Sequence, residues 1–179
     1  MAIREPFGTS EGLNSLNVGT ASGYATASEH GDGTFHKTKL DLSGALPAIA
    51  GGANLAVGRL LYTFPAGVVR IISAYFNNVA ITQKDGNITA DTPDVGLGTT
   101  IASGAVAVLS GTAAFENVLT GQTFSNCDGT GTKAGASSTL ILNAADNHTV
   151  YLNVADGWAA SGDAAAAISG EVIITWELL

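Results

Sequence analysis

From Thr34 onward, short runs of alternating apolar and polar residues recur along this chain, and Gly, Asn, Asp or Pro bounds each of them. In the closing segment GEVIITWELL, only Ile173 interrupts the polar face. The apolar face of that segment consists of Val172, Ile174, Trp176 and Leu178. A period of two places every second side chain on the same face of an extended chain, so these runs predict half-buried β-strands.

Further strands are expected in the segments HKTKLDLSG, NLAVGRLLYTF, VVRIISAYFNNVAI, PDVGLGTT, GAVAVLSG, STLILNAAD and TVYLNVADG. In the last of these, Val150, Leu152 and Val154 alternate with more polar residues, which places Asn153 on the polar face. The one weak helical candidate is DGWAASGDAAAAI, and Gly162 interrupts it. The pattern therefore indicates an all-β chain.

The stretch LLYTFPAGVVRIISAYFNNVAI, from Leu60 to Ile81, places two apolar runs on either side of a turn. Pro65 has a fixed φ and no N–H to donate to a ladder, while Gly67 tolerates positive φ. The stretch is therefore predicted to be two strands joined at a corner.

With 179 residues, the chain is long enough for one domain with a substantial core, whereas two domains would both be small. Residues 1–33 are rich in Gly, Ser, Thr, Asn and Ala and lack a period, so we expect an extended N-terminal arm there. Residues 34–179 are predicted to form an antiparallel β-sandwich. A jelly roll of about eight strands fits this length, and periodicity alone does not separate it from another Greek-key sandwich.

Charged residues make up only 12% of the chain, and the formal net charge is -8. An acidic protein repels phosphates, so no nucleic-acid partner is expected. A surface with so few charges suits a protein that packs against other proteins better than it suits an isolated monomer.

Cys127 is the only cysteine, so no disulfide can form within the chain. The N-terminal residues lack the apolar core of a signal peptide, and no apolar run approaches the ~18 residues that span a bilayer. We therefore expect a soluble product of the cytoplasm with no membrane partner.

No G-x-S-x-G or G-x-G-x-x-G motif joins a predicted strand to a helix, and H-E-x-x-H and C-x-x-C do not occur. The glycine-rich segment DGTGTKAGAS differs from a phosphate-binding loop because Ala134 follows Lys133. We therefore predict that the chain is not an enzyme, and assign no catalytic, cofactor-binding or metal-binding residue.

Two segments carry residue types that bind metals. In HGDGTFH, the side chains of His30, Asp32 and His36 are possible ligands, but no fourth ligand is near in sequence, which favours a polar stretch before a strand. The loop KDGNITADTPD contains Asp85, Asn87, Asp91 and Asp94 without the spacing or the closing Glu of an EF-hand. A solvated turn is the favoured interpretation there.

Arg70 lies between Val69 and Ile71 in the most apolar predicted strand. A buried guanidinium needs a partner. The sequence leaves two alternatives open, namely that Arg70 faces solvent or that it pairs across a contact between subunits.

Several of these segments, in this order, resemble the capsid decoration (cement) proteins of tailed bacteriophages. The resemblance extends from about Gly33 to Leu179 and includes no catalytic signature. It is carried by YTFPAG at 62–67, DVGLGT at 94–99, AFENVLTGQT, TVYLNVADGW and the closing ISGEVIITWELL.

This resemblance implies a jelly-roll-like fold and a homotrimer on the outside of an icosahedral head, where major capsid protein subunits meet. Such proteins bridge neighbouring capsomers and stabilise the shell. The expected location is therefore the outer capsid surface of a virion, after synthesis in the host bacterial cytoplasm.

A different class of function remains as an alternative, namely a carbohydrate- or receptor-binding β-sandwich of the head-fibre type. Such a module needs exposed aromatic side chains for stacking on sugars. Trp176 is expected on the core face of its strand, so Trp158, in the loop sequence DGW, is the candidate.

Overall fold

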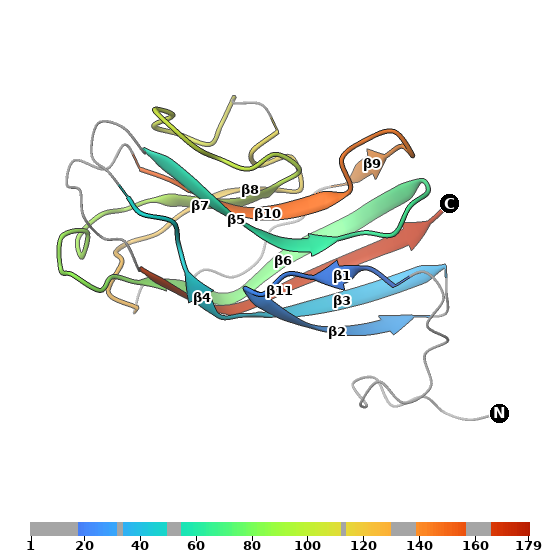
Figure 1. The fold of residues 1–179 in the computed structure, drawn as a ribbon, viewed down its shortest axis with the longest axis horizontal. Coiled ribbons are helices and arrows are strands. Elements are labelled where there is room, and N and C mark those ends of the chain that lie inside the picture. Colours follow the sequence, from blue (N-terminus) through green and yellow to red (C-terminus); the bar gives the residue numbers. More distant parts are fainter. Residues whose placement is uncertain (1–17, 32–33, 50–54, 112–113, 130–138, 157–165) are drawn as a thin grey trace.

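The computed structural model describes residues 18–31, 34–49, 55–111, 114–129, 139–156 and 166–179. These residues form two antiparallel sheets packed face to face, without helices (Figure 1). Sheet A has the strand order β1 (Thr20–Ala21), β5 (Ala56–Thr63), β10 (Thr149–Ala155), β7 (Asp94–Gly98) and β8 (Leu119–Thr123). Sheet B has the order β2 (Ala25–Gly31), β3 (Phe35–Leu42), β11 (Ala167–Leu178), β6 (Val69–Thr82) and β9 (Leu140–Leu142), and β4 (Gly44–Ala45) also pairs with β11. The predicted all-β antiparallel sandwich is confirmed.

Successive strands from β4 to β11 mostly lie in opposite sheets. Among the strands that the structure describes, only the connection from β7 to β8 remains within one sheet, and the other connections from β4 to β11 cross between sheet A and sheet B. Neither sheet is therefore built from one continuous stretch of sequence, and neither can form its core face without the other.

The apolar side of the predicted alternation faces the space between the sheets. In β3, every second residue from His36 to Leu42 is buried, and in β11 the buried residues include Val172, Ile174 and Trp176. The main core unites apolar side chains from both sheets, as the period-two pattern predicts.

The predicted corner joins the two sheets. β5 ends at Thr63 in sheet A and β6 begins at Val69 in sheet B, with Phe64 buried between them. Gly67 has a φ of 130°, a backbone conformation that residues with a Cβ rarely adopt. A Cβ at this position would also lie 2.9 Å from Cδ1 of Leu178. The corner therefore depends on glycine for both backbone conformation and space.

Two expectations about elements are corrected. Residues 18–31, assigned by sequence to an arm, belong to the sandwich, because β1 pairs with β5 and β2 pairs with β3. The low apolar content of β2 hid this strand, which lies at a sheet edge and needs few buried side chains. The rest of the predicted arm that precedes them, residues 1–17, lies outside the described residues.

The segment GAVAVLSG, expected to be a strand, contains no strand and belongs to the long connection between β7 and β8. Most of the weak helical candidate lies outside the described residues, and its last residues begin β11. Within the described part of the chain, no helix is long and apolar enough to cross a membrane.

Replacing Gly67 by Ala should destabilise the protein by about 1–3 kcal/mol, since the new Cβ strains the backbone and presses on Leu178. The matched control is Gly23→Ala, because nothing lies within 4 Å of a Cβ at Gly23. Urea unfolding of both variants measures the difference. Equal stabilities for the two variants would contradict this account of the corner.

Candidate functional site: an uncharged surface loop

The connection between β7 and β8 is residues 99–118, and we call it the β7–β8 loop; its described parts, residues 99–111 and 114–118, fold back over the outer face of sheet A. Its residues Ala102, Leu109 and Phe115 are buried against Ala56 and Ala155 in a second hydrophobic cluster. Ala155 lies on the face of β10 opposite the main core, since its neighbour Val154 points into that core. The β7–β8 loop therefore has a small core of its own.

Asn153 of β10 fastens this loop to the sheet. Its side-chain Oδ1 accepts a hydrogen bond from the backbone N–H of Ala102 at 2.8 Å. Its Nδ2 donates to the carbonyl oxygens of Thr100 at 2.9 Å and Phe115 at 2.8 Å. The three bonds join both ends of the loop to one residue that is 0% exposed. Leaving such a group without partners would cost about 1–3 kcal/mol for each lost bond.

The alternation placed Asn153 on the polar face of its strand and gave it no role. The residue does point away from the main core, as the alternation predicts, but the β7–β8 loop covers it. The signal in the sequence was indirect, namely the lack of any charged residue from Val95 to Phe115.

Glycines on the outer face of sheet A let the loop lie directly on the strands. A Cβ at Gly98 would overlap with the backbone of Ala114 and Phe115, and a Cβ at Gly58 would overlap with Oδ1 of Asn153. The spacing of glycines in DVGLG thus reflects close approach of two backbones. Ala114 itself is in a left-handed conformation, with a φ of 59°, which is uncommon for a residue with a side chain.

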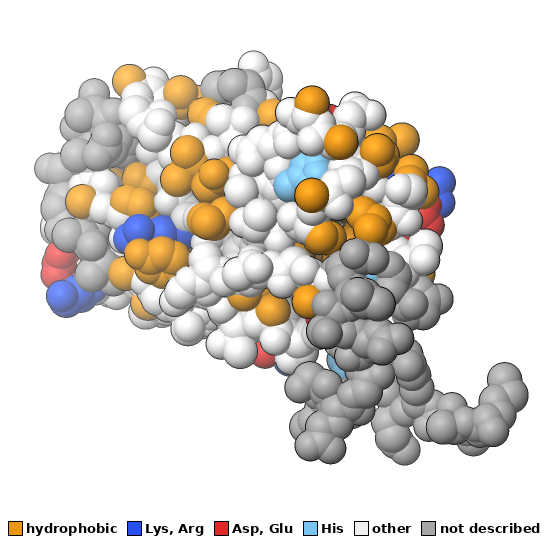
Figure 2. Space-filling view, turned by 45° about the vertical axis from the view of Figure 1, so that its right-hand side comes forward, with side chains coloured by type: hydrophobic (Ala, Val, Ile, Leu, Met, Phe, Trp, Pro, Cys, Tyr) orange, Lys and Arg blue, Asp and Glu red, His pale blue; other side chains and the backbone are white. Residues whose placement is uncertain are grey.

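From Thr100 to Gly111 the loop exposes uncharged side chains, apolar ones together with Thr100, Ser103 and Ser110. Ile101 is 44% exposed and Val108 is 51% exposed, and Ala105 and Ala107 between them are also exposed. Figure 2 shows one face of the molecule on which hydrophobic side chains occur in several small groups and charged ones are few. A loop held by buried bonds and presenting apolar side chains has the character of a contact surface.

The outer face of sheet B is different, because its charged side chains pair with one another. Lys39 Nζ lies 2.9 Å from Asp41 Oδ1 and 3.1 Å from Glu171 Oε1. Hydrogen bonds to Asp41 and Glu171 raise the pKa of Lys39. Arg70 forms an ion pair with Glu177, its neighbour in the ladder between β6 and β11. Of the two alternatives for Arg70, the structure shows an exposed side chain, paired within the chain.

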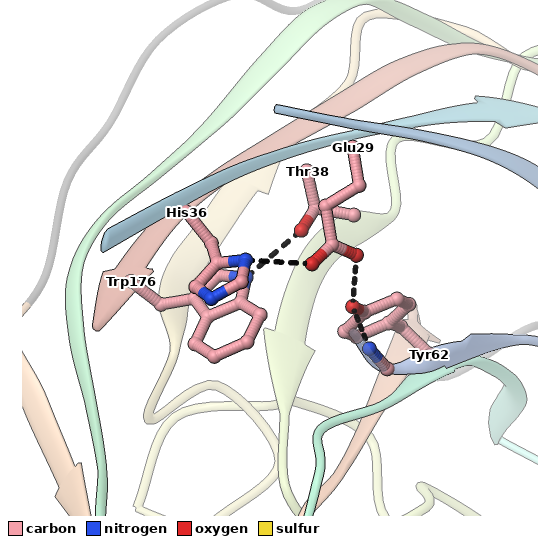
Figure 3. A network of polar contacts seen from close by, with 6 residues as sticks. Glu29, His36, Thr38, Tyr62 and Trp176 are labelled. Carbon is pink, nitrogen blue, oxygen red and sulfur yellow. Dashed lines mark hydrogen bonds and ion pairs between the residues drawn. The ribbon is translucent and has the colours of Figure 1, made fainter. Parts of the chain in front are cut away.

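A buried polar cluster joins the two sheets at their edge and consists of Glu29 on β2, His36 on β3 and Tyr62 on β5 (Figure 3). Glu29 Oε1 lies 2.9 Å from Nδ1 of His36. The hydroxyl of Tyr62 donates to Glu29 Oε2 at 2.5 Å and accepts from the N–H of Gly19 at 2.8 Å. Burial, with the bond to Glu29, raises the pKa of Tyr62, so the phenol keeps its proton and remains a donor.

Aromatic packing continues this cluster into the core. The ring of His36 stacks on that of Trp176 with centroids 4.0 Å apart, and Trp176 Nε1 donates to Thr38 Oγ1 at 2.8 Å. The side chains of Glu29 and His36 are 9% and 2% exposed, and Tyr62 is 0% exposed. Because so little of the cluster is open to solvent, we interpret it as a tie between β2 and β5.

The metal-binding interpretation of HGDGTFH, which the sequence disfavoured, does not fit its two histidines. His36 points inward to Glu29, whereas His30 lies opposite Lys37 in the ladder and on the other face of sheet B. Asp32 lies outside the described residues. Within the ranges that the structure describes, no group of three His, Cys, Asp or Glu side chains could hold a metal ion.

The other residues that the sequence singled out lie at several different places. Cys127 is buried, with its Sγ 3.7 Å from the carbonyl oxygen of Asp91. Asp85 and Asn87 are exposed in the turn after β6. Lys133 and Trp158 lie outside the described residues.

Asp156, just after β10, has a perturbed carboxyl group. Burial raises its pKa from 3.8 to about 6, and the charges of Asp91 and Asp94 contribute in the same direction, against a backbone hydrogen bond from Thr92. Burial also raises the pKa of Asp91. At neutral pH this end of the sandwich therefore holds carboxylates whose ionisation opposes folding.

The Tyr62→Phe substitution should destabilise the protein by about 1–3 kcal/mol, because it leaves Glu29 and the Gly19 N–H without their bonds in a buried site. Amide hydrogen exchange should also become faster in β1. The control is Tyr75→Phe, which removes a hydroxyl from a side chain that is 40% exposed. Thermal unfolding that is the same for both variants would contradict the proposed tie.

The Asp156→Asn substitution should stabilise the protein above pH 7. The folded-state pKa of about 6 exceeds the ordinary 3.8, so this group's contribution is fully present below pH 3.8 and is lost as pH rises through 6. We expect a gain of about 1 kcal/mol at pH 7.5, reduced by solvent screening of the half-exposed carboxyl, and none near pH 4.

The measurement is urea unfolding at both pH values, on freshly purified protein because Asn before Gly157 is prone to deamidation. Asp85→Asn, in an exposed turn, makes the same change in net charge and serves as the control. A gain of the same size at both pH values, or an equal gain for the control, would refute the assignment to Asp156.

In comparisons with known proteins, no protein-family model, curated protein or solved structure matches this chain. Its function is therefore inferred from its own sequence and geometry, and above all from the β7–β8 loop that the sandwich carries.

Proposed function

We propose that this chain is a structural decoration protein of a tailed-phage head. It binds the outer surface as a homotrimer, stabilises contacts between major capsid protein subunits and catalyses no reaction. The observation that carries this proposal is the β7–β8 loop, which Asn153 holds firmly and which presents uncharged apolar side chains. A surface of this kind suits lasting contact between proteins.

The order of the strands supports a jelly roll as the finer description of the fold. Eight strands, β3 and β5 to β11, form two facing sets of four in the orders β3-β11-β6-β9 and β5-β10-β7-β8. Two interlocked Greek keys produce such an order. On this description, β1, β2 and β4 are additions at one edge.

The charge of the chain supports an outer position on a head filled with DNA. With a net charge of -8, the protein is repelled by packaged phosphates. Trimers that contact several capsid subunits at once gain avidity, so each single contact can be weak.

The carbohydrate-binding alternative has one observation in its favour. Phe35 and Tyr75, both on sheet B, are exposed aromatic side chains of the kind that stack on sugars. Trp176 is 0% exposed, in agreement with its expected place on the core face of its strand. Glycan-array binding that is lost in Trp158→Ala or Tyr75→Ala would favour this alternative over capsid decoration.

The decisive experiment mixes the purified chain with expanded heads of the encoding phage that lack decoration protein. We expect the chain to sediment with expanded heads and to raise the temperature at which they release DNA, since bridging contacts resist rupture of the shell. Unexpanded shells, whose subunits are arranged differently, are the control. If the chain neither binds nor stabilises expanded heads, the proposal fails.

A further inference from the structure

We infer that the β7–β8 loop is the surface through which copies of this chain contact one another. This inference rests on the proposed function, because it assigns a place to the contacts within the proposed homotrimer. Its first support is that the described part of the loop is fixed by the bonds of Asn153 and by the packing of Phe115 and Leu109. A loop that is already ordered loses little entropy when it binds.

The second support is electrostatic. Each copy carries a net charge of -8, so two copies repel each other except where their facing surfaces are uncharged. The segment from Val95 to Phe115 contains no Asp, Glu, Lys or Arg. The part of the loop up to Phe115 is thus a place where copies can meet without bringing like charges together.

The carboxylates that flank this segment are held by their own neighbours. Asp94 Oδ1 accepts a hydrogen bond from the hydroxyl of Thr123 at 2.6 Å. Glu116 Oε2 accepts one from the backbone N–H of Gly121 at 2.7 Å. The carboxylates of Asp94 and Glu116 are thus both hydrogen-bonded to residues of β8. The apolar part of the loop between them therefore remains available as the contacting surface.

Symmetry favours a second copy over a different protein as the occupant. Near a rotation axis each residue meets its own equivalents, so a charged side chain there would face the same charge. Ile101 and Val108 can meet their equivalents by burying apolar surface. Sheet B also exposes Phe35, Tyr75 and Ile141, but there Lys39 and Arg70 are already paired with carboxylates of their own chain, and burying those pairs would cost desolvation.

The test measures the oligomeric state of the full chain by sedimentation equilibrium and native mass spectrometry. We expect a trimer for the unchanged protein and a monomer for Val108→Asp, with association weakened by roughly 100-fold or more, because each copy would bury a carboxylate near its equivalents. The matched control is Ile141→Asp on β9, since Ile141 and Val108 are both 51% exposed. This control should remain a trimer.

Thermal unfolding of dilute samples shows whether Val108→Asp still folds, and Ile101→Asp provides an independent second variant in the same loop. Unchanged protein that is monomeric, or loop variants that assemble as well as Ile141→Asp, would overturn the inference. Loop variants that remain trimers but no longer bind expanded heads would also overturn it, and would assign the loop to the capsid instead.

The two proposals fail in different ways. Trimers that dissociate on Val108→Asp but never bind heads would refute capsid decoration and leave the self-contact standing. A chain that binds heads but whose assembly does not depend on the loop would refute the self-contact and leave capsid decoration standing.

Discussion

The two sheets bury their apolar faces against each other, and the corner, the polar cluster and the β7–β8 loop all depend on this packing. Trp176 lies within it, between the ring of His36 and that of Phe64. Because nearly every connection after β4 crosses between the sheets, the core cannot form in one sheet alone. Hydrophobic burial therefore holds together strands that are distant in sequence.

At the edge of the sandwich, polar contacts replace apolar ones. Glu29 points inward from β2, a way in which edge strands avoid pairing with other chains, and its carboxylate is bound by His36 and Tyr62. The tie also reaches Gly19, just before β1. This edge is therefore closed by hydrogen bonds between groups that would be costly to leave unpaired.

The outer faces of the two sheets differ in the charges that they carry. Sheet B presents charges that pair within the chain, as Arg70 does with Glu177, and also exposes Phe35, Tyr75 and Ile141. Sheet A is lined with glycines and carries the β7–β8 loop, whose exposed side is apolar. The structure thus places an uncharged loop on sheet A and a face of paired charges on sheet B, and the proposed trimer builds on that difference.

The sequence by itself determined most of the strands and which face of each is apolar, because a period of two is a local property of the chain. It also located the corner at Gly67. It assigned residues 18–31 to an arm and placed Asn153 only on the polar face of its strand, because the partners of both depend on what else packs nearby. Only the tertiary structure decided that Glu29 meets Tyr62 and that Asn153 lies beneath a loop, because these contacts join segments far apart in the chain, and local alternation carries no information about such partners.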